Sequence, residues 1–179
     1  MVKTLKKSIG LLGGSFDPAH SGHLKISKIA LRKIRLNKVI WIVSKKNPFK
    51  NKPLYSLQQR IKKAREIAIN EKKIQVSFLD EIVGSSRIIN IVSYLINERK
   101  KKNIYFIIGS DNLINFHKWK SWKKIVNLVK LIVFSRKGYD KKGKKSIVAK
   151  YLKNKILFIN NKPIIISSSK LRKKIKKIT

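Results

Sequence analysis

Short apolar runs of strand length alternate with longer amphipathic segments along almost the whole chain, and no other feature restricts the fold as strongly. The expected strands span residues 9–12, 39–43, 74–78, 104–108, 131–134, 156–159 and 164–167, and the expected helices span 21–35, 56–70, 88–99, 119–128 and 168–177. Apolar strands that are separated by helices are typical of βαβ units and of a parallel sheet covered on both faces. The pattern therefore predicts an α/β fold of the Rossmann-like, doubly wound type with a mostly parallel sheet.

Length and composition predict one domain over residues 1–179. Of the 179 residues, 42% are hydrophobic, which is enough for one buried core, and we find no linker or internal repeat. The stretches 47–53 and 138–145 are expected to be loops. The absence of cysteine excludes disulfides and thiolate-bound metals. Because no apolar run reaches the length of a membrane span or a secretory leader, we expect a cytoplasmic protein with no membrane partner.

The basic charge of the chain has two candidate origins. There are 45 Lys and Arg residues against 8 Asp and Glu residues, which gives a formal net charge of +37. Such a charge would suit a polyanionic partner such as nucleic acid or anionic lipid. It would also follow from A/T-rich codons, because Lys, Ile and Asn are all abundant here. The basic residues are spread along the chain without a local patch that includes aromatic side chains, which favours codon bias over nucleic-acid binding.

The densest group of unusual residues follows the first expected strand. Gly13 and Gly14 end that strand, and Ser15 and Phe16 come next. In an open parallel sheet, ligands bind beyond the carboxyl ends of the strands. Glycine at such a position lets the backbone approach a ligand and offer its N–H groups. We therefore expect this turn to contact a ligand.

Two of the three histidines, His20 and His23, lie where the next helix is expected to begin. Residues three apart share one face of a helix, and a helix N-terminus attracts anions through its N–H groups and its dipole. Two imidazoles at this place could donate hydrogen bonds to phosphate oxygens. A metal site is disfavoured, because Asp17 is the only acidic residue close to them in sequence.

Two later segments suit the same ligand chemistry. Residues 167–169 are three serines before the final helix, and Arg172 follows one turn later. Hydroxyls, helix N–H groups and a guanidinium together suit a polyphosphate, although a serine there could equally cap the helix. Asp111 follows Gly109 at a strand end, where its carboxylate could accept from a ribose hydroxyl or a purine amine, or could cap a helix.

Five blocks in consistent order resemble the nucleotidyltransferases that carry an HxGH motif. They are GGSFDPAHSGHL (13–24), NPFK (47–50), IIGSDNLINFHKWKSWKKI (107–125), FSRKGYD (134–140) and ISSSKLRKKI (166–175), in which Ser169 replaces a threonine. This group includes the nicotinate-nucleotide and the pantetheine-phosphate adenylyltransferases. The pantetheine enzymes usually have threonine where this chain has His20, so the sequence resembles the nicotinate-nucleotide branch more closely.

The resemblance implies an enzyme of NAD biosynthesis that transfers AMP from ATP to nicotinate mononucleotide and releases pyrophosphate. The acceptor phosphate is already a nucleophile, so catalysis needs alignment and charge neutralisation, with Mg²⁺ carried by ATP and no metal held by the protein. The implied catalytic residues, taken as preorganised cations, are His20, His23, Lys50 and Arg172. The implied ATP-binding residues are Gly13, Gly14, Ser15, Phe16, Gly109, Asp111, Ser167, Ser168 and Ser169. The implied acceptor-binding residues are Ser86, Arg87, Trp119 and Arg136.

The sequence departs from the family pattern after the third expected strand. These enzymes usually carry Tyr-Thr-x-Asp-Thr there, whereas this chain has Arg87, Ile88, Asn90 and Ile91 at the corresponding positions. Arg87 could offer a new contact to a carboxylate, and Trp119, expected to share a helical face with Trp122, is implied to stack on the pyridine ring. Two alternatives stay open: another acceptor, such as nicotinamide mononucleotide or phosphopantetheine, or a basic nucleic-acid-binding protein on the same fold. The sequence makes no prediction of an oligomeric state.

Overall fold

The computed structural model describes residues 8–45, 52–100, 103–161, 164 and 166–175. Its centre is a six-stranded sheet in the order β3-β2-β1-β4-β5-β6, in which every neighbouring pair is parallel. The strands are β1 (Ile9–Gly14), β2 (Lys38–Val43), β3 (Ile74–Ser77), β4 (Ile104–Gly109), β5 (Lys130–Phe134) and β6 (Leu157–Ile159). The helices are α1 (Ser21–Lys33), α2 (Leu57–Ala68), α3 (Asp80–Val83), α4 (Ile88–Asn97), α5 (Ser110–Asn115), α6 (Trp122–Leu128), α7 (Asp140–Lys144), α8 (Ile147–Leu152) and α9 (Ser168–Ile175), with 3-10 turns η1 (Phe116–Lys118) and η2 (Lys153–Lys155).

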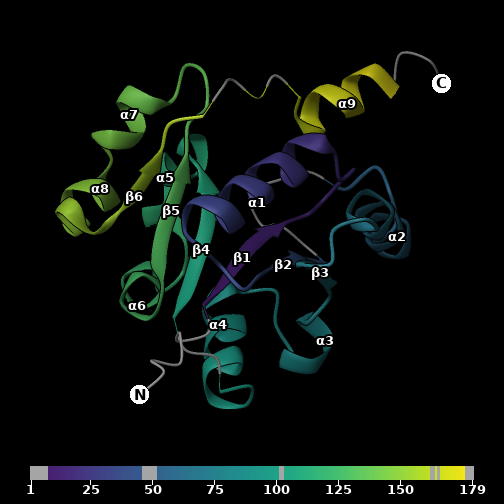
Figure 1. The fold of residues 1–179 in the computed structure, drawn as a ribbon, viewed down its shortest axis with the longest axis horizontal. Helices are drawn as coiled ribbons and strands as arrows, with labels where there is room; N and C mark the ends of the chain where they lie inside the picture. Colours follow the sequence, from purple (N-terminus) through teal and green to yellow (C-terminus); the bar gives the residue numbers. More distant parts are fainter. Residues whose placement is uncertain (1–7, 46–51, 101–102, 162–163, 165, 176–179) are drawn as a thin grey trace.

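Helices cover both faces of the sheet (Figure 1). On one face, α1 and α2 pack on a core that contains Phe16, Trp41 and Ile107. On the other face, α4, α5, α6 and α8 pack on a core that contains Phe106 and Phe116. The apolar runs form strands because both of their faces are buried, which is the arrangement expected for a parallel sheet. The predicted doubly wound α/β fold is confirmed.

The strand order indicates where a ligand would bind to the sheet. From β1 the chain builds outward through β2 and β3, and then it returns to the other side of β1 with β4, β5 and β6. The direction of winding therefore changes between β1 and β4. Ligands of doubly wound sheets bind at this switch point, beyond the carboxyl ends of the strands. Gly14 and Gly109 end the two strands that flank it.

Three expectations about single elements were wrong, and one helix was not expected. Residues 164, 166 and 167 belong to no strand, so the last expected strand is not formed by the described part of 164–167. The expected loop 138–145 contains α7. The helix expected at 119–128 begins only at Trp122, because Ser121 has a φ of 59° and interrupts it. The six-residue helix α5 was not expected, since one and a half turns give too few residues to show a helical period.

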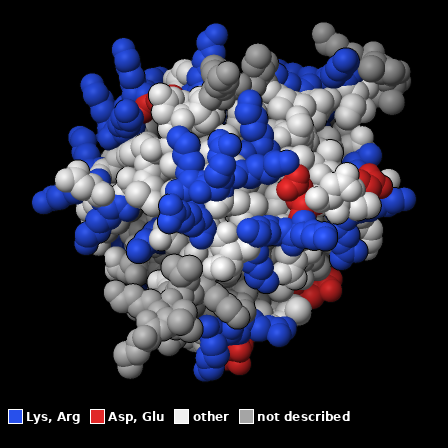
Figure 2. Space-filling model, viewed as in Figure 1, with Lys and Arg blue, Asp and Glu red and all other residues white. Residues whose placement is uncertain are grey.

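Lys and Arg side chains are spread over most of the face shown in Figure 2, in keeping with their even spread along the sequence. Asp and Glu side chains are few on this face. Within the described residues, no helix is both long enough and apolar enough to cross a membrane.

Candidate active site

The glycine turn at the end of β1 is packed against two aromatic rings. A Cβ built on Gly13 would come close only to the ring of Phe106, at an ordinary contact distance of 3.6 Å, so packing within the described residues does not demand glycine there. Phe16, in contrast, is 1% exposed, and its ring stacks on that of Trp41 with 5.2 Å between the centroids. The Phe16 side chain therefore belongs to the core, and a contact of this residue with ATP stays a prediction. Ser15, between these residues, is also buried.

His20 and His23 form a capping box at the start of α1. His20 is the N-cap residue, and its Nδ1 accepts a hydrogen bond from the backbone N–H of Gly22 at 3.1 Å. In return, Nδ1 of His23 accepts from the backbone N–H of His20 at 3.2 Å. The two rings lie 3.9 Å apart between centroids. Because each Nδ1 is an acceptor, each ring in this arrangement carries its proton on Nε2, as a neutral donor.

The protonation of His20 follows from its surroundings. The residue is 9% exposed, and burial, together with the positive charge of Arg136, lowers the pKa of His20 from 6.5 to about 4. This pKa favours an uncharged His20 at neutral pH, and the catalytic role of His20 stays a prediction. At neutral pH the ring offers an N–H donor without a charge, and it lies at the N-terminus of α1, where the helix dipole favours an anion.

The C-terminal helix α9 is fastened to the turn between β1 and α1. Arg172 donates through Nη1 to the backbone carbonyl of Asp17 at 2.8 Å, and the same nitrogen lies 3.5 Å from Oδ2 of Asp17. Ser168 donates through Oγ to the carbonyl of Pro18 at 3.0 Å. Figure 1 shows α9 beside the first turn of α1. Residues separated by about 150 positions are thus brought together, and Arg172 comes close to the His20 turn.

The three serines have separate roles in this contact. Ser167 caps α9, because its Oγ accepts from the backbone N–H of Lys170 at 3.2 Å. Ser169 accepts through Oγ from Nη2 of Arg172 at 3.1 Å. With Ser168 bonded to Pro18, each serine has a hydrogen-bonding partner inside the protein. Ser167 therefore forms the helix cap that was the alternative to phosphate binding. Binding of ATP by these hydroxyls stays a prediction.

An ion pair between Asp111 and Arg136 faces this site from the ends of β4 and β5. Arg136 Nη1 lies 3.5 Å from Asp111 Oδ2, and both side chains are partly exposed. Asp111 Oδ1 is buried and has no hydrogen-bond partner among the described residues. A Cβ on Gly109 would come within 2.4 Å of this oxygen, so a larger residue there would force the carboxylate to shift. A buried acceptor without a partner is costly, which suits an oxygen that a ligand hydroxyl or amine would satisfy.

Asp140 holds the Arg136 backbone in place. Its carboxylate accepts from the hydroxyl groups of Ser110, at 2.7 Å, and Ser135, and from the backbone N–H of Arg136 at 2.9 Å. Burial raises the pKa of Asp140, but hydrogen bonds from Ser135, Ser110 and the Arg136 backbone outweigh it and lower the pKa overall. The carboxylate therefore ties the end of β4 to the end of β5. The sequence reasoning assigned no role to Asp140 or Ser110, although both lie within matched motifs, 134–140 and 107–125.

This chain matches the family described as Cytidylyltransferase-like over residues 11–174. A probable nicotinate-nucleotide adenylyltransferase of Pelagibacter ubique (strain HTCC1062) is 50% identical over 169 residues, which cover 94% of this chain and 93% of the relative. The chain belongs to the nicotinate-nucleotide adenylyltransferase family. The resemblance drawn from the five motifs is confirmed.

Further relatives of this family extend the likeness. A probable nicotinate-nucleotide adenylyltransferase of Clostridium novyi (strain NT) is 35% identical over 175 residues, covering 95% of this chain and 88% of the relative. Among solved structures, the Plasmodium falciparum nicotinic acid mononucleotide adenylyltransferase complexed with NaAD superposes with a TM-score of 0.73. It is 21% identical and covers 93% of this chain and 83% of that chain, so it supports the fold.

Three of the four residues predicted to contact the acceptor lie on the side of the sheet that α4 and α6 cover: Ser86, Arg87 and Trp119. The fourth, Arg136, follows β5. Arg87 is exposed as the N-cap of α4, and Ser86 next to it donates to Asp80. Trp119 is partly buried and stacks on Phe116, with 4.7 Å between the ring centroids. The expectation that Trp119 shares a helical face with Trp122 was wrong, because α6 begins after Trp119. Acceptor contacts of this adenylyltransferase stay a prediction.

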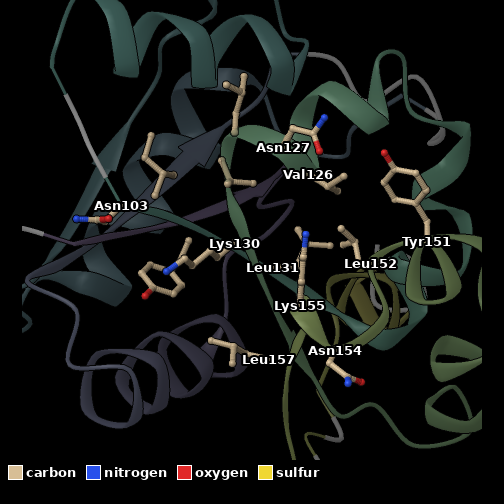
Figure 3. Close-up of a pocket in the computed structure, with 14 residues that line it drawn as sticks. Asn103, Val126, Asn127, Lys130, Leu131, Tyr151, Leu152, Asn154, Lys155 and Leu157 are labelled. Carbon is tan, nitrogen blue, oxygen red and sulfur yellow. The ribbon is translucent and has the colours of Figure 1, made fainter.

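Lys50 lies outside the described residues. Among the described residues, no group of three or more His, Cys, Asp or Glu side chains could hold a metal ion. A groove of about 840 Å³ lies at the opposite, amino ends of β4, β5 and β6, where Leu152, Lys130 and Lys155 are among its lining residues (Figure 3). None of the predicted site residues that the structure describes is among the residues that line this groove.

The sequence reasoning also missed two buried charged residues of this adenylyltransferase, Arg60 and Asp80, which are 2% and 6% exposed. A signal for Arg60 was present. It stands three residues after Leu57 and four before Ala64, which places it on the apolar face of α2. A charged residue on the buried face of a helix is rare unless its charge is matched and its N–H groups are satisfied.

Proposed function

We infer that this protein transfers AMP from ATP to nicotinate mononucleotide, giving nicotinate adenine dinucleotide and pyrophosphate. One observation carries the inference: a histidine pair caps α1 directly after the glycine turn of β1, Arg172 is bonded to the turn that leads to it, and the charge of Arg136 acts on His20. This arrangement offers N–H donors, a helix N-terminus and two guanidinium groups to a polyphosphate. The similarity to nicotinate-nucleotide adenylyltransferases supplies the reaction.

The mechanism requires alignment rather than a general base. An oxygen of the acceptor phosphate attacks the α-phosphorus of ATP, and the bond from that phosphorus to the leaving pyrophosphate breaks. We propose that His20 and His23 donate through Nε2 to phosphate oxygens near the reacting phosphorus. Arg172 provides positive charge from α9, and Lys50 is proposed to do the same. Donors already held in place by the fold stabilise developing charge without reorganisation during the reaction.

The metal requirement is proposed to belong to the substrate. The described residues offer no cluster of ligands for a metal ion, so Mg²⁺ is expected to arrive bound to ATP. The ion would neutralise phosphate charge, while the protein's donors orient the two phosphates. We also propose that residues 1–179 form one domain and that the protein is cytoplasmic.

The remaining predicted residues are proposed to bind the nucleoside of ATP and the nicotinate part of the acceptor. We propose that the unpartnered Oδ1 of Asp111 accepts from a ribose hydroxyl or the purine amine. Arg87 is proposed to contact the nicotinate carboxylate from the N-terminus of α4, where an anion is favoured, and the rings of Trp119 and nicotinate are proposed to stack. Ser86 and Arg136 complete the proposed acceptor contacts.

The test is a comparison of acceptors. Purified protein with ATP and Mg²⁺ is offered nicotinate mononucleotide, nicotinamide mononucleotide or phosphopantetheine, and kcat/KM is measured from pyrophosphate release. The proposal predicts the highest value for nicotinate mononucleotide. A higher value for either of the other acceptors would reject the substrate, and no turnover together with salt-sensitive binding of duplex DNA would favour the nucleic-acid alternative.

A further inference from the structure

The side chain of Arg60 bonds to four backbone carbonyls. Its Nη1 donates to Ser15 at 2.7 Å and to Ser44 at 2.8 Å, its Nη2 to Lys45 at 3.2 Å, and its Nε to Tyr55 at 3.2 Å. A guanidinium is the side chain that suits this task, because it has five N–H donors in a fixed plane. No other residue type could satisfy so many carbonyls from this place.

These carbonyls belong to three segments that border the candidate active site. Ser15 lies in the glycine turn after β1, Ser44 and Lys45 follow β2, and Tyr55 precedes α2. The end of β2 is already tied to that turn, since the backbone N–H of Ser44 donates to Gly14 at 3.0 Å. Arg60 therefore fixes the Ser15 turn, which leads to His20, against the two segments beside it.

Two buried carboxylates accept hydrogen bonds from the backbone N–H groups of Tyr55 and Lys45, whose carbonyls bond to Arg60. Asp17 accepts from the backbone N–H of Tyr55 at 3.0 Å, whereas Arg60 bonds to the carbonyl of Tyr55. Asp80 accepts from the N–H of Lys45 at 2.7 Å, whereas Arg60 bonds to the carbonyl of Lys45. Burial lowers the pKa of Arg60, and the negative charges of Asp17 and Asp80 offset part of this effect.

The two carboxylates extend this brace in opposite directions. Asp17 contacts Arg172, which is proposed to bind ATP phosphates. Asp80 accepts from Ser86, which is proposed to lie on the acceptor side. The three buried residues Arg60, Asp17 and Asp80, here called the loop brace, thus connect the parts of the site that must present two phosphates to each other.

We propose that Arg60 is a positioning residue for adenylyl transfer, which fixes the distance between the ATP and acceptor sides without touching either substrate. The proposal rests on the proposed function. Because alignment supplies much of the rate in a reaction that needs no general base, a loosened brace should lower kcat more than it weakens ATP binding. Arg60→Lys keeps the charge but has three donors on one atom, so it cannot reach all four carbonyls.

The experiment compares Arg60→Lys with the wild type and with Leu152→Ala. Leu152 is a buried core residue of α8 that lines the groove at the opposite ends of the strands, so its truncation lowers stability away from the site. Denaturant unfolding measures the stability of each protein. Calorimetric titration with a non-hydrolysable ATP analogue counts the folded sites, and kcat is expressed per site.

We expect Arg60→Lys to bind the analogue with near-normal stoichiometry and affinity, while kcat per site falls roughly tenfold or more. Leu152→Ala should keep its kcat per site. Equal kcat per site in Arg60→Lys and Leu152→Ala would overturn the proposal. If Arg60→Lys does not fold, Asp80→Asn carries the test, because it keeps the shape of the brace but removes a charge; wild-type kcat per site in that variant would overturn it. Absence of wild-type turnover would instead reject the proposed function.

Discussion

Acidification to about pH 5 should leave His20 neutral in the folded protein while an unfolded chain would protonate it. The pKa of His20 is lowered from 6.5 to about 4, first by burial and second by Arg136. At about pH 5, roughly a tenth of the folded molecules would carry a proton on His20, against nearly all unfolded chains. The ring therefore stays an N–H donor at a pH where an exposed histidine is a cation.

The same difference predicts how stability depends on pH. Between about pH 6.5 and pH 4, the unfolded chain binds a proton at His20 that the folded protein does not, so the free energy of unfolding falls as the pH is lowered through this window. The difference between the two pKa values corresponds to about 3 kcal/mol over the full window. This contribution is fully present above the unfolded pKa.

NMR titration of the histidine rings measures this pKa directly, with assignment by comparison with a His20→Asn spectrum. We expect a His20 midpoint well below that of an ordinary histidine, and a higher midpoint in Arg136→Gln, because the nearby positive charge is removed. A wild-type midpoint near 6.5 would refute the reasoning, since it would mean that the ring is solvated or paired with an acid.

Three substitutions test other parts of the site. His23→Ala should lower kcat on the order of 10²-fold, as expected for the loss of one preorganised donor, and unchanged turnover would reject its assigned role. Gly109→Ala places a methyl group where the Asp111 carboxylate lies, so the KM for ATP or for the acceptor should rise; kinetics indistinguishable from wild type would contradict the role of Asp111. Asp140→Asn weakens the hold on the Arg136 backbone and should reduce kcat/KM in steady-state assays, with retained kcat/KM counting against the role of that carboxylate.

The fold could be predicted from the sequence because its signals are local. Apolar runs such as 39–43 and 104–108 are buried on both faces, and the helices between them keep a regular apolar stripe. The expected strand at 164–167 failed for the opposite reason. An apolar run alone does not fix pairing, and this segment instead leads to the contact of α9 with the β1–α1 turn.

The candidate site could be predicted in its residue types but not in its electrostatics. The spacing of His20 and His23 indicated a shared helix N-terminus, and the structure places them there. That His20 is neutral could not be predicted, because burial and the approach of Arg136 from β5 arise only in the folded chain. Arg60 was missed because the chain has 45 Lys and Arg residues, so one more basic residue on α2 did not stand out.

The central claim is that an oxygen of the acceptor phosphate attacks the α-phosphorus of ATP in this site. It is tested most directly with nicotinate mononucleotide whose phosphate oxygens carry an isotopic label, followed by mass spectrometry of the products. The account predicts nicotinate adenine dinucleotide that retains all of the label, and unlabelled pyrophosphate in equal amount. Label in the pyrophosphate, or no dinucleotide product at all, would contradict it.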